Sequence, residues 1–231
     1  MPVLTPPSTL DVGRFIRPST EEIVELLLAY YTEMPAWTYG PARAVARSVF
    51  SGEISLKAAV HGCETRGSLL GRPWNAEVAK LVWEAGRDRS LKCFKLSKRK
   101  FAIRQDLSFS VDPLFFFVEE GKIKIFWLQP RSGFNPTVKG LGIIATILRM
   151  TFADDFENFD LELLDLSRPK GTKIRVPKTY TFSDLPLLPE EEVRLGLSRF
   201  AEAYDIVSAR GVQRPERRVR PQDDRQLRFP E

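Results

Sequence analysis

The chain has 231 residues, a formal net charge of +5, and 43% hydrophobic and 28% charged residues. This length suits one large domain, or a core with a helical appendage, and the composition is typical of globular proteins rather than disordered or membrane-embedded ones. Two cysteines and one histidine are too few for a usual four-ligand zinc site or for a framework of several disulfides. A reduced, cytoplasmic location is therefore expected. The N-terminus has no signal-peptide pattern and no apolar run is long enough to span a bilayer, so no membrane partner is expected.

The first third of the chain is predicted to be helical. Residues 1–18 are rich in Pro and Thr and are expected to form an extended N-terminal segment. Apolar residues at helical spacing then predict helices over 20–32, 41–51 and about 54–61. We therefore expect a helical N-terminal region over 19–74, to which no chemistry can be attached.

The middle of the chain changes to an alternation of helices and strands. Asn75 is the expected N-terminal cap of a helix that ends near Gly86. Apolar and β-branched patterns then predict the following elements: strands at 101–111, 113–118 and 122–129, a helix at 137–152, strands at 159–166 and 175–182, and a helix from 190 to about 207.

From residue 75 onward the predicted order is αβββαβ, followed by a C-terminal helix. A crossover helix after an antiparallel hairpin indicates a mixed central sheet flanked by helices, so the fold class is α/β (α+β). We expect this core and the last helix to occupy 75–210. Residues 211–231, with six arginines, four acids and several prolines, are expected to form a basic flexible tail.

A basic segment precedes the predicted hairpin. Residues 87–104 carry eight basic side chains against the single acid Asp88. The candidate nucleic-acid-binding residues within the segment are Lys92, Lys95, Lys98, Arg99 and Lys100. Such a stripe could bind phosphates; the alternative is a solvated face without a partner.

The hairpin VDPLFFFVEEGKIKIFWLQPR, residues 111–131, has polar residues at both ends. If its turn centres on Glu120 and Gly121, Asp112 faces Gln129 and Ser110 faces Arg131. Residues opposite one another in an antiparallel pair share a face of the sheet, and Arg131, two residues beyond Gln129, shares it too. Asp112, Gln129 and Arg131 are thus predicted to form a polar cluster. Alternatively, Asp112 only begins a strand, and the other two are polar strand ends.

The order helix, three strands, helix, strand, with Asp-Pro before the second strand and a polar-x-basic triplet ending the third, resembles the PD-(D/E)XK nuclease superfamily over roughly residues 75–168. The resemblance implies that Asp112 binds Mg²⁺, that Gln129 stands in the position of the second acid, and that Arg131 stands in that of the lysine. Glu77 is the candidate for the helix glutamate that some members use. Two residues differ from the family pattern in ways that affect catalysis. Glutamine brings no charge to Mg²⁺, so an acid such as Asp106 would have to supply it. Arginine is a poor general base.

Three functions remain open at the level of sequence. With Mg²⁺ as cofactor, Asp112, Gln129 and Arg131 would form the catalytic site of a phosphodiesterase, with Asp112 as its metal ligand. Without catalysis, the same core would be a degenerate binder of nucleic acid, with DNA preferred to RNA. The rival class is a protein-protein interaction or assembly protein that uses the N-terminal helices.

Overall fold

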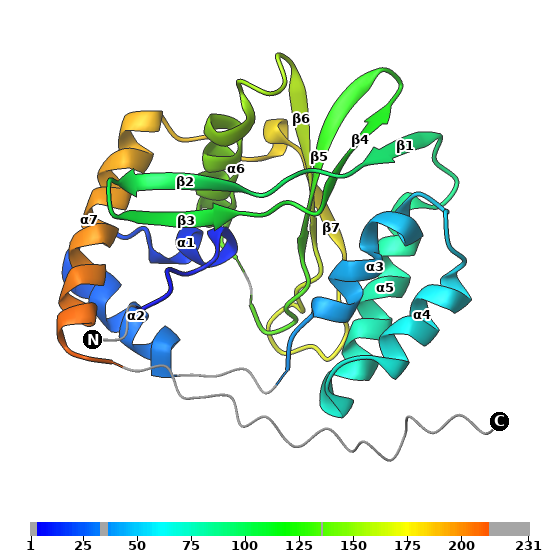
Figure 1. Cartoon of the computed structure of the whole chain (residues 1–231), viewed down its shortest axis with the longest axis horizontal. Helices are drawn as coiled ribbons and strands as arrows, with labels where there is room; N and C mark the ends of the chain where they lie inside the picture. Colours follow the sequence, from blue (N-terminus) through cyan, green and yellow to red (C-terminus); the bar gives the residue numbers. More distant parts are fainter. Residues whose placement is uncertain (1–3, 33–36, 135, 213–231) are drawn as a thin grey trace.

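The computed structural model describes residues 4–32, 37–134 and 136–212 (Figure 1). The α-helices are α1 (Thr9–Phe15), α2 (Thr20–Thr32), α3 (Gly40–Phe50), α4 (Leu56–Thr65), α5 (Arg72–Gly86), α6 (Val138–Phe152) and α7 (Glu190–Ala209), with short 3₁₀ turns at Leu69–Gly71 and Phe182–Asp184. The strands are β1 (Leu91–Phe94), β2 (Arg99–Arg104), β3 (Leu107–Val111), β4 (Phe115–Glu119), β5 (Lys122–Gln129), β6 (Phe159–Asp165) and β7 (Lys178–Tyr180).

The centre of the fold is a mixed sheet of five strands in the order β1-β4-β5-β6-β7. β5 and β6 run parallel, joined through α6, and the other neighbours are antiparallel. The sheet is flanked by helices, which confirms the predicted α/β class. The expected αβββαβ order is only partly reproduced: α5, β4, β5, α6 and β6 lie where expected, but the predicted first strand, 101–111, is not part of the central sheet.

The hairpin of β4 and β5 has the predicted register. Phe115 pairs with Phe126 and Glu119 with Lys122, so the turn consists of Glu120 and Gly121. Both turn residues have positive φ, 51° and 76°, as a tight two-residue hairpin turn requires, and Gly121 adopts this conformation without steric cost.

Each face of the sheet carries its own core, and Figure 1 shows helices on both sides. Phe126 and Leu128 of β5 pack with α3, α4 and α5, whereas Ile125 and Trp127 of the same strand pack with α1 and α6. Both faces of β5 are therefore buried, as its sequence predicted for a central strand. A third core joins α1, α2 and α7.

One predicted strand proves to be two. Residues 101–111 were expected to form a single strand, but Gln105 and Asp106 turn the chain and β2 pairs with β3 as a separate two-stranded sheet. This hairpin extends across α6 towards α7 (Figure 1), where Arg104 donates two hydrogen bonds to Asp205 at 2.7 and 2.6 Å. The first strand of the central sheet is β1, which the sequence analysis did not predict.

The N-terminal predictions need two corrections. Residues 1–18 are not extended throughout, because Thr9–Phe15 form α1, whose Leu10, Val12 and Phe15 are buried. Asn75 lies inside α5, which starts earlier because Pro73 occupies its first turn. The Asn75 side chain instead accepts a hydrogen bond from Ala42 N at 2.9 Å at the start of α3.

The expected helical region 19–74 is divided between the two faces of the sheet. α2 packs against α7, whereas α3 and α4 pack against α5 on the opposite side. Most of the predicted tail, residues 213–231, lies outside the described residues. Within the described ranges, no helix combines the length and the apolar character that a membrane span requires.

Candidate functional site

The predicted polar cluster is only partly assembled. β4 begins at Phe115, so Asp112 lies outside the strand and does not pair with Gln129. Pro113, which has no N–H to donate to the sheet, separates Asp112 from β4. The Asp112 carboxylate binds Arg43 of α3 at 3.2 Å instead. Sequence reasoning missed this partner because Arg43 is far away in the chain.

Gln129 is fully buried, and its amide holds the loop that follows β5. Its Nε2 donates to the carbonyls of Arg131 at 2.8 Å and Phe134 at 3.0 Å, and its Oε1 accepts from Arg131 N at 3.0 Å. The structure therefore gives Gln129 a structural task, and its oxygen is already engaged.

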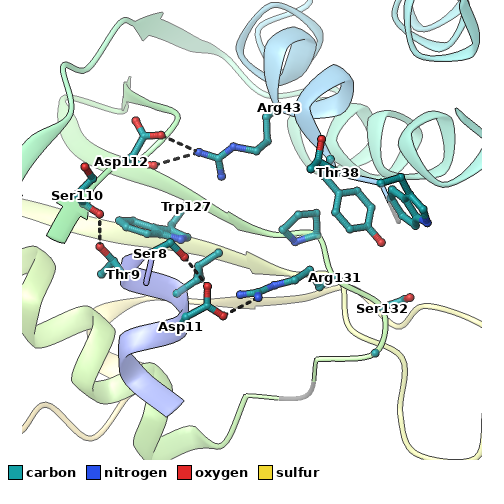
Figure 2. A pocket seen from close by; sticks show the side chains of 15 residues that line it. Ser8, Thr9, Asp11, Thr38, Arg43, Ser110, Asp112, Trp127, Arg131 and Ser132 are labelled. Carbon is teal, nitrogen blue, oxygen red and sulfur yellow. Dashed lines mark hydrogen bonds and ion pairs between the residues drawn. The ribbon is translucent and has the colours of Figure 1, made fainter. Parts of the chain in front are cut away.

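Asp112 and Arg131 do meet at one pocket of about 590 Å³ at the end of the sheet (Figure 2). Its walls come from the start of α1, the segment before α3, the end of β3 and the end of β5. Arg43 and Arg131 reach towards it from two sides, and the Trp127 indole lies on the wall near Asp112 and Asp11. Such a volume is typical of small-ligand sites.

Both arginines of the pocket are paired with carboxylates. Arg131 Nη1 donates to Asp11 Oδ1 at 2.6 Å, and Asp11 also accepts a hydrogen bond from Ser8 at 2.8 Å. Burial lowers the pKa of Arg43; Asp112 opposes this shift and the nearby charge of Arg131 adds to it. Arg43 and Arg131 therefore both line the pocket, and each is neutralised by a carboxylate.

Trp127 lines this pocket and carries a buried polar atom. The side chain is 3% exposed, and its indole nitrogen has no hydrogen-bond partner among the described residues. A buried N–H donor without an acceptor is unfavourable.

The remaining candidate acids lie in ion pairs. Asp106 accepts from Arg104 at 2.7 Å at the tip of the β2–β3 hairpin, and Glu77 accepts from Arg175 at 2.8 Å. Asp165, a buried acid that the sequence analysis did not consider, accepts two hydrogen bonds from Ser167. Burial raises its pKa, and the hydrogen bonds from Ser167 oppose that shift.

These residues do not fit a magnesium ion. Among the described residues, no three His, Cys, Asp or Glu side chains lie close enough together to hold a metal ion. Mg²⁺ requires oxygen ligands near octahedral positions and is usually held by carboxylates. Here Asp112 is bound to Arg43 and the Gln129 oxygen to a backbone N–H.

The basic segment divides into two classes of residue. Its arginines all form ion pairs: Arg87 with Asp88, Arg89 with Glu119 and Glu162, Arg99 with Asp155, and Arg104 with Asp106 and Asp205. The four lysines are exposed and form no ion pair with a described residue: Lys92, Lys95, Lys98 and Lys100. Lys100 pairs across the hairpin with Ser110, which lines the pocket. Lys100 itself lines a neighbouring pocket, which Ser110 also lines.

The chain matches no protein-family model, and neither the curated proteins nor the solved structures contain a significant match to it. The function of this protein is therefore inferred from its own geometry.

Proposed function

We propose that this protein binds nucleic acid, preferentially duplex DNA, through a restriction-endonuclease-like core and does not cut it. The observation that carries the proposal is a set of four exposed lysines that form no ion pair with a described residue. They lie on β1, β2 and the segment between them: Lys92, Lys95, Lys98 and Lys100. Lysines without an internal partner are available to neutralise phosphates and release counterions. Phe94, which is 42% exposed among them, gives this surface an aromatic side chain as well.

The pocket supports the same proposal. The core order resembles that of PD-(D/E)XK nucleases, and Asp112 and Arg131 line the pocket at the end of the sheet. Arginines are well suited to binding phosphate oxygens in a bidentate manner. Arg43 and Arg131 line the pocket, and no cluster of carboxylates that could hold Mg²⁺ is found among the described residues. These features suit the pocket to holding a phosphate rather than hydrolysing it.

The binding test is the salt dependence of affinity for a labelled DNA duplex, measured by fluorescence anisotropy. Each lost phosphate contact should lower the slope of log affinity against log salt by about 0.9. The double variant Lys95→Gln/Lys98→Gln should therefore lower the slope by about 2. Lys57→Gln/Lys80→Gln, with the same charge change at two exposed positions of α4 and α5, should leave it unchanged. No binding by the wild type at low salt would leave the assembly-protein alternative.

The cleavage test separates a binder from a nuclease. Wild-type protein and Asp112→Ala are incubated with duplex and single-stranded DNA in the presence of Mg²⁺. We expect no cleavage from either. Mg²⁺-dependent cleavage that disappears in Asp112→Ala would show that the pocket is catalytic and would overturn the non-cutting part of the proposal.

A further inference from the structure

The loop between β6 and β7 carries only positive charge. Residues 166–177, LSRPKGTKIRVP, contain four basic residues and no acid. The loop lies at the same end of the sheet as the pocket: Arg168 donates through its backbone N to Ser132 O at 3.0 Å and through its side chain to Ser132 Oγ at 2.9 Å. Ser132 lines the pocket, so the loop and the pocket belong to one surface.

The base of this loop is firmly held by Arg175. Its side chain is 1% exposed, and its guanidinium donates to Glu77, Tyr39 and the carbonyls of Pro130 and Leu166, at distances of 2.6 to 2.9 Å. Val176 N also donates to Ser167 O at 3.3 Å. One buried cation therefore joins the loop to α5, the segment before α3 and the ends of β5 and β6.

Beside Arg175, the loop exposes an apolar side chain that follows Lys173. Ile174 is 75% exposed although its neighbour Arg175 is buried. Thr172 Oγ1 contacts the carbonyls of Pro169 at 3.0 Å and Ile174 at 3.2 Å, which gives the tip a defined shape. Lys170 and Lys173 are exposed and form no ion pair with a described residue. The loop thus presents a branched apolar side chain on a rigid base.

We propose that Ile174 is a wedge that enters between adjacent base pairs of duplex DNA, while Lys170 and Lys173 bind the flanking phosphates. This inference rests on the proposed function and adds to it the way in which DNA is deformed. Apolar side chains that unstack a base step are used by proteins that bend DNA. The charge of the loop favours a polyanion. Ile174 and the partly exposed Val176 give too little apolar surface for stable anchoring in a bilayer, which requires a larger apolar group or a second anchor.

The test compares a perfect duplex with one that carries a central mismatch, because a mismatched step costs less to unstack. Wild-type protein should bind the mismatched duplex about five- to tenfold more tightly, since unstacking a paired step costs a few kcal/mol. Ile174→Ala should bind both duplexes with nearly equal affinity. Leu195→Ala, on α7 and 56% exposed in the wild type, is the matched control and should retain the preference.

The outcomes distinguish this inference from the function on which it rests. If the wild type binds DNA but shows no preference for the mismatch, or if Ile174→Ala keeps that preference, the wedge is wrong and DNA binding stands. If no duplex is bound at low salt, the proposed function fails and the wedge fails with it. Binding to phosphatidylserine vesicles that Ile174→Ala abolishes, without any duplex preference, would assign the loop to membranes and overturn the wedge.

Discussion

Single residues decide whether the pocket can accept an anion. Arg43 and Arg131 each face a carboxylate, so the charged side chains that line the pocket are two cations and two anions. The two pairs differ in exposure: the Asp112 side chain is 55% exposed, whereas that of Asp11 is 6% exposed. Asp112 can therefore turn into solvent when a phosphate approaches Arg43, because an exposed ion pair is weak.

Asp112→Asn should increase DNA affinity. The substitution removes the carboxylate that competes with phosphate for Arg43, and the gain should be about two- to fivefold, as expected for an exposed ion pair. Anisotropy titration of wild type and variant measures this effect. A metal-dependent site predicts the opposite, since the variant would lose a ligand and bind more weakly when Mg²⁺ is present.

Arg89 lies between two acids and makes one of the stronger charge networks of the sheet. Its guanidinium donates to both oxygens of Glu119 at 2.7 Å and to both oxygens of Glu162 at 2.7 and 2.8 Å. Hydrogen bonds from Arg89, joined by Lys124, lower the pKa of Glu119 from 4.5 to about 2. Glu119 thus binds a proton less readily in the folded chain than in the unfolded chain.

This shift predicts a stability that depends on pH. Above about pH 5 the contribution of Glu119 is fully present, and it is lost as the pH falls towards the folded pKa of about 2. Urea unfolding of wild type and Glu119→Gln at pH 7 and pH 3 should show a difference in unfolding free energy that is smaller at pH 3. An equal difference at both pH values would show that the ion pair is not its cause.

At the scale of elements, the glycines of α6 look out of place in a buried helix but allow close packing. A Cβ atom on Gly142 would lie 2.2 Å from the carbonyl oxygen of Pro186, which is backbone and cannot move aside as a side chain can. Gly140 and Gly13 approach each other in a similar way, and this lets α1 lie against α6.

Gly142→Ala should therefore destabilise the protein by about 2 kcal/mol or more, as overpacking in a core does, although alanine is the better helix former. Gly62→Ala is the control: it lies in α4, and a Cβ there would meet one side-chain atom at 4.0 Å. That variant should be neutral or stabilised by up to about 1 kcal/mol. Thermal or urea unfolding measures both, and similar behaviour of the two variants would contradict the packing argument.

The elements that were predicted correctly have strong local signals. The register of β4 and β5 was predictable because Glu120 and Gly121 form a turn between two apolar runs. The turn at Gln105 and Asp106 was missed because it contains neither Gly nor Pro, and so 101–111 looked like one strand. At the site, Asp112 and Arg131 were placed at the correct end of the sheet, but their partners Arg43 and Asp11 come from distant helices. No local pattern encodes such contacts.

At the scale of the whole molecule, the two main cores share the same strands. β5 and β6 contribute side chains to both, with Leu163 on one face of β6 and Leu164 on the other. These strands cannot unfold from one core without also exposing the buried side chains of the other core. The helices on the two faces are therefore coupled through the strands between them.

We expect the chain to unfold in a single transition despite its three cores. Far-UV circular dichroism, which reports on the helices, and the fluorescence of the four tryptophans, of which Trp74 and Trp83 lie in α5 and Trp127 in β5, should give coincident urea curves. Curves that separate would show that the helices on one face form an independent domain. Phe15→Ala, which removes a fully buried ring from the third core, should shift both curves together, by about 3 kcal/mol or more.

The β2–β3 hairpin affects how quickly the five-stranded sheet forms. Phe94 and Phe116 pair directly in β1 and β4, yet the whole hairpin is inserted in the chain between them. The contact between these strands closes a loop whose entropic cost falls if β2 and β3 have paired first. A chain shortened to join β1 to β4 by a tight turn should therefore form its five-stranded sheet more quickly. Such a chain would lack Ser110 and Asp112, which line the pocket. The segment that slows assembly therefore also supplies residues of the pocket.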